Sequence, residues 1–190
     1  EAALPRSAGD LLPTSPAGIS VAVADRLDTL AGLFAVVGAP KATADPFGLR
    51  RAAYGAVQAL VSSGVRCDLR AALKEAAELQ PVTCGDDVVD ECLEYITRRL
   101  EQYLVDDGCG IEAVRAVLAE RGGDPALAAE TARALDGETR NGGSAELKAA
   151  VLVLGRPTKL VRGKELPDDL EVKRESLVEP EEIALYEAYV

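Results

Sequence analysis

The sequence predicts an all-α protein, a bundle of about eight helices with a compact N-terminal unit and a looser C-terminal half. Two observations carry this prediction. Hydrophobic residues make up 48% of the chain but aromatic residues only 4%, so the core must be built from Ala, Leu and Val, which favours closely packed helices. The apolar residues also recur at steps of three and four, the period of a helix face. No segment has a convincing strand pattern.

The first predicted helix begins at Pro16, with Ser15 as its cap, and lasts to about Gly38. Serine before a proline at the first helical position is a favourable start. One face of this helix is apolar over its whole length and carries Ile19, Val23, Leu27, Leu30, Phe34 and Val37. We expect this face to enter the core.

Two carboxylates, Asp25 and Asp28, fall on the opposite face of the same helix, among small uncharged residues. Such a face suggests a helix that is buried on both sides. Because a buried carboxylate needs a partner, we predict structural ion pairs for Asp25 and Asp28, with at least one of them largely buried. The candidate partners are the arginines at positions 6, 50 and 51.

The second predicted helix starts at Pro46, with Asp45 as its cap, and ends before Gly64. Six more helices are expected further along the chain, at about 68–79, 87–105, 111–121, 125–136, 145–154 and 180–190. Two irregular segments separate the last of them. The tract 137–143 reads as a flexible loop, and the stretch 156–178, rich in proline and charge, as extended chain.

Charge and cysteine content exclude several classes of function. The net charge of -11 argues against a dominant nucleic-acid surface and leaves room only for a local basic patch. The four cysteines form no CxxC pair and there is no histidine, so we predict reduced thiols and neither metal nor cofactor. No apolar run approaches the roughly 20 residues of a membrane span. Since the chain starts at Glu1 and lacks Met, we expect a fragment or a processed piece.

Two stretches of sequence carry a family resemblance. Residues 24–32 read A-D-R-L-D-T-L-A-G, and residues 45–53 read D-P-F-G-L-R-R-A-A. They resemble the β chain of the bacterial and plastid type of glycyl-tRNA synthetase, with A-D-K-(L/M)-D-T-L-x-G and D-P-F-x-L-R-R-A-A. Residues 5–10 are similar to that family's P-R-F-A-G-D. Weaker similarity continues at 103–108, 113–119 and 177–182, so the resemblance covers nearly the whole chain.

The resemblance implies a domain organisation. Residues 1–80 would be the end of an HD-type helical domain, and residues 81–136 a helical body. Residues 137–190 would form a flexible loop and the start of a region like the anticodon-binding domain. The histidine of the family's E-H-Y-x-P-R is absent from residues 1–6, which counts against HD-type metal chemistry. The family's K-R-(V/A)-x-N-I-L is replaced at residues 155–160, which weakens the case for an RNA contact there.

The candidate RNA-contacting residues are the few clustered cations. Arg6, Lys41, Arg50 and Arg51 could form a small patch facing tRNA phosphates, because the resembled domain is expected near the acceptor end of tRNA. Arginine suits carboxylate pairing equally well, so internal ion pairs remain an alternative for this group. A second basic strip contains Arg156 and Lys159 and is either a solvated linker or an RNA-facing surface. No residue pattern indicates a catalytic centre.

The resemblance therefore implies a non-catalytic segment of an organellar or bacterial glycyl-tRNA synthetase that positions tRNA. Its partners would be tRNA, bound weakly, and the catalytic chain or domain of the synthetase. The expected location is a plastid, another organelle or the bacterial cytoplasm. The rival interpretation is a synthetase-derived structural subunit of an organellar complex, partnered by the other subunits of that complex. The missing histidine and the negative charge favour the rival.

Overall fold

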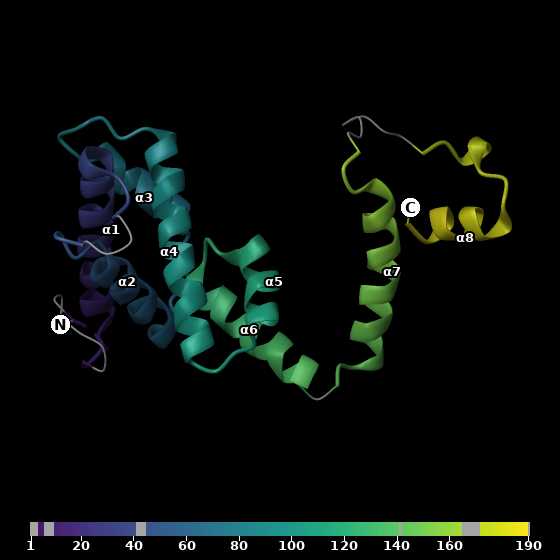
Figure 1. Ribbon diagram of the computed structural model, residues 1–190, viewed down its shortest axis with the longest axis horizontal. Helices are drawn as coiled ribbons and strands as arrows, with labels where there is room; N and C mark the ends of the chain where they lie inside the picture. Colours follow the sequence, from purple (N-terminus) through teal and green to yellow (C-terminus); the bar gives the residue numbers. More distant parts are fainter. Residues whose placement is uncertain (1–3, 6–9, 41–44, 141, 165–171, 190) are drawn as a thin grey trace. The chain divides into compact units, whose positions relative to one another are not determined.

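The computed structural model describes residues 4–5, 10–40, 45–140, 142–164 and 172–189. Within these ranges the chain is helical and contains no strand, so the all-α prediction is confirmed. Figure 1 shows the eight α-helices found there, which are α1 Pro16–Val37, α2 Leu49–Ser63, α3 Leu69–Glu78, α4 Asp86–Asp106, α5 Ile111–Arg121, α6 Pro125–Arg140, α7 Ala145–Val161 and α8 Pro180–Tyr189. A short 3-10 turn, Arg174–Ser176, precedes α8.

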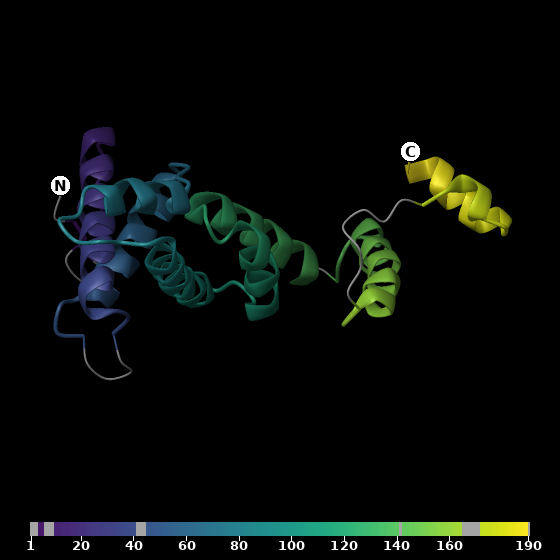
Figure 2. The ribbon, with the colours of Figure 1, turned by 90° about the horizontal axis from the view of Figure 1, so that it is seen from above.

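The chain forms two compact units, Glu1–Gly143 and Ser144–Val190. The first unit holds α1 to α6, and α4 is its central element because it contacts each of the other five helices. Figures 1 and 2 show α1 and α2 crossing on one side of α4, with α5 and α6 on the other. The fully buried large side chains come mainly from α2, α3 and α4 and include Leu49, Leu60, Leu69, Leu73, Ile96, Leu100 and Leu104.

Helix α1 has the bounds that the sequence predicts. The Ser15 hydroxyl accepts a hydrogen bond from the Gly18 amide at 3.1 Å, and Pro16 occupies the first turn. Gly38, at φ 69°, ends the helix by donating its N–H to the Phe34 carbonyl. A positive φ of this kind is accessible to glycine without strain. The predicted apolar face is buried from Ile19 to Phe34, while Val37 at the end is half exposed.

Three predicted boundaries are wrong. Helix α2 starts at Leu49 rather than at Pro46, because residues 46–47 form a turn. Helix α6 continues to Arg140 through half of the predicted loop, since an ion pair of 2.9 Å joins Arg140 to Asp136 one turn earlier. Helix α7 continues to Val161 through the stretch predicted as extended, because local hydrogen bonds outweigh the low helix propensity of glycine and proline.

Helix α7 shows which local hydrogen bonds extend it. The Ser144 hydroxyl accepts from the Leu147 amide at 3.1 Å and caps its start. Near its end, the Thr158 hydroxyl donates to the Leu154 carbonyl at 2.8 Å, and the Arg162 amide donates to the Thr158 carbonyl at 3.0 Å. The apolar residues 151–154 are each more than half exposed, between 61% and 66%. This run does not enter a core within the described part of the second unit.

A buried arginine joins α1 to α2. Arg26 is only 7% exposed, and its guanidinium donates to the Ala22 carbonyl at 2.6 Å and to the Pro5 carbonyl at 3.0 Å. Burial lowers the pKa of Arg26, and the neighbouring Asp25 carboxylate opposes this effect. The two helices can approach closely here because α2 has Gly55 opposite the guanidinium. A Cβ at position 55 would lie 2.5 Å from the Arg26 Nε.

Replacing Gly55 by alanine is therefore expected to displace the Arg26 guanidinium and weaken its hydrogen bonds. Hydrogen bonds to charged groups contribute about 1.5–3 kcal/mol each, so G55A should lower the free energy of unfolding by about 1–3 kcal/mol. The matched control is G137A in α6, where an added Cβ meets nothing within 4 Å. That variant should be neutral or stabilised by up to about 1 kcal/mol. Urea unfolding followed by circular dichroism measures both, and equal stabilities for the two variants would contradict the close packing described here.

Candidate nucleic-acid interface

The predicted carboxylates of α1 are placed on its outer surface. Asp25 and Asp28 are both exposed, so the expected burial is wrong. Arg26 is the buried polar residue instead, at the close approach of Gly55 in α2. Asp28 instead accepts a hydrogen bond from the Gln80 Nε2 at 2.6 Å, which ties α1 to the end of α3. Neither carboxylate forms an ion pair with a described arginine, and pairing with Arg6 lies outside the described residues.

The start of α2 is held by a carboxylate. Asp45 accepts hydrogen bonds from the amides of Leu49 at 2.8 Å and Arg50 at 3.0 Å. These amides have no partner inside the helix, so the predicted capping role of Asp45 is confirmed although the helix begins later. Gly48, at φ 71°, makes the sharp entry into the helix. This turn fixes the position of Arg50, which is half-buried, and of Arg51, which is exposed.

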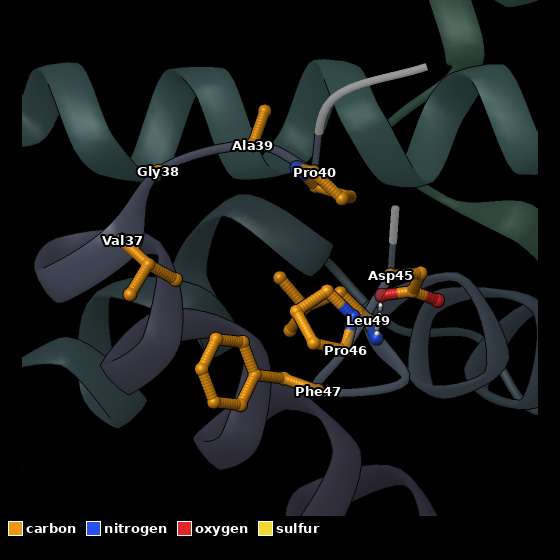
Figure 3. Close-up of a pocket in the computed structure, with 8 residues that line it drawn as sticks. All are labelled: Val37, Gly38, Ala39, Pro40, Asp45, Pro46, Phe47 and Leu49. Carbon is orange, nitrogen blue, oxygen red and sulfur yellow. Dashed lines mark hydrogen bonds between the residues drawn. The ribbon is translucent and has the colours of Figure 1, made fainter. Parts of the chain in front are cut away.

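An apolar hollow of about 210 Å³ lies beside this turn. Figure 3 shows Val37 at the end of α1 facing the Pro46 and Phe47 side chains of the turn, with the Asp45–Leu49 hydrogen bond behind them. Phe47 is 54% exposed although it is a large aromatic residue. The segment formed by Ala39 and Pro40 borders this hollow and also a second one of different character.

The second hollow has a volume of about 400 Å³ and a basic lining. Its walls are the Ala39–Pro40 segment, Arg50 of α2, and Tyr95, Arg98 and Arg99 of α4. We call it the arginine hollow. Three guanidinium groups from two helices meet there, and no carboxylate is among the described lining residues. On a chain of net charge -11, this is a local concentration of positive charge that suits an anion.

Tyr95 forms the floor of the arginine hollow. Its ring packs edge to face on Phe34 with centroids 5.3 Å apart, and the Arg99 guanidinium carbon lies 5.4 Å from the ring centroid. Tyr95 is 5% exposed, and while burial raises the pKa of its hydroxyl, the Arg50 guanidinium lowers that pKa as a hydrogen-bond donor. A guanidinium cannot accept, so the hydroxyl proton has no acceptor among the described residues. The Arg99 Nε is likewise buried without an acceptor there, although buried polar groups usually have one.

The electrostatics of Tyr95 reflect both burial and neighbouring charge. Burial raises the pKa of the Tyr95 hydroxyl, while the Arg99 and Arg50 cations lower it and the Asp45 carboxylate raises it. At neutral pH the hydroxyl is therefore protonated and available as a donor. The remaining arginine contacts are weak, since Arg98 lies 4.0 Å from the exposed Glu94, and Arg99 donates to the Gln102 side chain at 3.1 Å. These contacts therefore neutralise Arg98 and Arg99 only in part.

The other predicted cations do not join this group. Arg6 and Lys41 lie outside the described residues. Lys159 is exposed on α7 in the second unit, and for Arg156 only its place in that helix is described. Sequence reasoning missed Tyr95, Arg98 and Arg99. Their spacing of three and four residues places them on one face of α4, and that pattern was a signal available in the sequence.

The cysteines offer no reactive centre. All four are free thiols, and burial raises the pKa of each, that of Cys92 to about 12. A protonated thiol is a poor nucleophile and a poor metal ligand.

The described residues contain no cluster of three or more potential metal ligands. None of the helices in those residues has both the length and the apolar character to cross a membrane.

Comparison with known proteins decides the family. Residues 1–119 match the family described as "Glycyl-tRNA synthetase beta subunit". This chain belongs to that family. The matched residues include every side chain that lines the arginine hollow.

Three relatives show how far the similarity extends. The chain is 42% identical over 190 residues to "Glycine--tRNA ligase, chloroplastic/mitochondrial 2" of Arabidopsis thaliana, covering 100% of this chain and 17% of that protein. It is 37% identical over 185 residues to the "Glycine--tRNA ligase beta subunit" of Mannheimia succiniciproducens, covering 97% and 26%. The protein of that name from Actinobacillus pleuropneumoniae serotype 3 is 37% identical over 192 residues, covering 98% and 27%. The chain thus spans about a quarter or less of the length of these relatives.

Removing the Tyr95 hydroxyl is expected to leave the free chain at least as stable as wild type. Burying a hydroxyl whose proton has no acceptor costs about 1–3 kcal/mol in proteins, and Y95F removes that cost while keeping the ring. Y103F serves as the control, because Tyr103 is a partly buried ring on the same helix, packed on Tyr54. Thermal unfolding measures both variants. A loss of more than about 1 kcal/mol in Y95F alone would show that its hydroxyl makes a stabilising hydrogen bond within the protein.

Proposed function

We propose that this chain is a non-catalytic helical segment of a glycyl-tRNA synthetase β chain that helps to position tRNA. It extends from the end of an HD-type domain to the start of the anticodon-binding region. The observation that carries the proposal is the arginine hollow, which lies within the residues that match the family. Arginine is the side chain best suited to phosphate oxygens, because its planar fork donates two parallel hydrogen bonds.

The chemistry of glycine attachment belongs to other parts of the synthetase in this proposal. The sequence has no histidine, so an HD-type metal centre would lack its imidazole ligands. Partners of the segment are then tRNA and the synthetase's catalytic chain or domain. The name of the Arabidopsis relative places that protein in chloroplasts and mitochondria, and the other two relatives are bacterial. An organelle or the bacterial cytoplasm is the corresponding location for this chain.

A second candidate function is a structural subunit derived from a synthetase, without a role in aminoacylation. The net charge of -11 favours it, because acidic surfaces repel tRNA. The two candidates differ in whether the chain retains a tRNA contact. RNA binding therefore separates them directly.

The proposal predicts weak, salt-sensitive tRNA binding by the 190-residue chain. Each neutralised phosphate contributes about 0.9 to the slope of log affinity against log salt on a duplex, so a few cations give measurable binding only at low salt. Filter binding at low and moderate salt measures it. The variant R50Q/R51Q should bind several-fold more weakly than the matched variant R121Q/R133Q, whose arginines are exposed on α5 and α6.

Two outcomes would contradict the proposal. Tight binding that resists salt would contradict its electrostatic basis. No binding by wild type even at low salt would favour the structural subunit.

A further inference from the structure

We propose that the arginine hollow binds one backbone phosphate of the tRNA, held by Arg50, Arg98, Arg99 and the hydroxyl of Tyr95. This rests on the proposed function and adds to it a defined contact point. The residues of α4 in this site are not indicated by the motifs that identify the family. The structure brings them together with Arg50 around the hollow.

Positive charge converges on the arginine hollow. Three guanidinium groups around one hollow repel each other, and an anion bound among them would offset part of that repulsion. Two described carboxylates of the same elements have other contacts. Asp45 accepts two backbone amides at the start of α2, and Glu94 is exposed and only 4.0 Å from Arg98.

Two hydrogen-bond donors on residues that line the hollow have no acceptor in the described part of the protein. They are the Tyr95 hydroxyl proton and the Arg99 Nε–H, and both are buried. Tyr95 as a whole is more than nine-tenths buried. One phosphate group has enough acceptor oxygens to take a hydrogen bond from each donor. Charge-assisted bonds of this kind are about twice as strong as neutral ones.

The hollow is built on packed helices. The Tyr95 ring is held against Phe34 of α1 and beneath the Arg99 guanidinium. The backbone of Arg50 is held in the capped first turn of α2. The site therefore lies on packed helices whose positions are set before a ligand arrives, which reduces the entropy lost on binding. At about 400 Å³, the hollow falls within the usual size range of ligand sites in proteins.

The test compares variants of the 190-residue chain that have equal charge. R98Q/R99Q removes two cations from the hollow, and R121Q/R133Q removes two from α5 and α6, outside it. Circular dichroism and thermal unfolding first establish that both variants are folded. In filter binding to tRNA at low salt, we expect R98Q/R99Q to lose about tenfold or more in affinity, and its salt slope to fall by about 1. The control should change far less, because screening limits charge effects beyond about 10 Å.

A spectroscopic arm shows which ligand enters the hollow. The Nε–H resonance of Arg99, assigned with R99K, is followed by nitrogen-15 NMR during titration with tRNA, inorganic phosphate or polyglutamate. We expect tRNA to shift this resonance at the lowest concentration, and inorganic phosphate to shift it only at much higher concentration. Y95F should weaken the response to tRNA while the protein keeps its melting temperature.

The outcomes separate this inference from the function it rests on. If wild type binds tRNA and R98Q/R99Q loses no more affinity than the control, the phosphate site is overturned and the positioning function stands. If wild type binds no tRNA at low salt, both are overturned. A shift of the Arg99 resonance by polyglutamate but not by tRNA would assign the hollow to an acidic protein and overturn the inference.

Discussion

The close contact of α1 with α2 is the constraint on which the first unit depends. It requires a glycine at position 55, because the Arg26 guanidinium occupies the space where a side chain would begin. Arg26 in turn satisfies two backbone carbonyls, one of them in the segment before α1. A buried cation that is used in this way costs less than an unpaired one, and its bulk limits how closely α2 approaches α1 at Gly55. The direction of α2, and with it the position of Arg50, follows from this close contact.

Helix α4 places Tyr95, Arg98 and Arg99 beside Arg50 of α2, where they line the arginine hollow. It contacts every other helix of the first unit, and its inner residues Ile96, Leu100 and Leu104 are fully buried. The Tyr95 ring completes this apolar face, while Arg98 and Arg99 continue it toward the surface. A helix so firmly packed presents its polar edge in one geometry. The acidic character of the whole chain is therefore compatible with a basic site, because the sign of a local surface depends on which side chains converge there.

The sequence predicts the helices well where local signals agree with packing. Ser15–Pro16 and Gly38 predict both ends of α1, and the apolar period predicts its buried face. The prediction fails where contacts between residues far apart in the sequence decide the structure. The small residues on their face predict burial for Asp25 and Asp28. The close approach of α2 buries Arg26 instead. The extension of α6 includes Asp136, which accepts a hydrogen bond from the distant Gly110 amide at 2.8 Å as well as pairing with Arg140, and loop composition does not reveal that contact.

The most direct measurement of the central claim is arginine-specific modification by phenylglyoxal, mapped by mass spectrometry with and without tRNA at low salt. The account predicts that tRNA protects Arg50, Arg98 and Arg99 together, while Arg121 and Arg133 react equally in both samples. Protection of arginines elsewhere in the chain, with those of the hollow reacting unchanged, would contradict the claim that tRNA is positioned at the junction of α2 and α4.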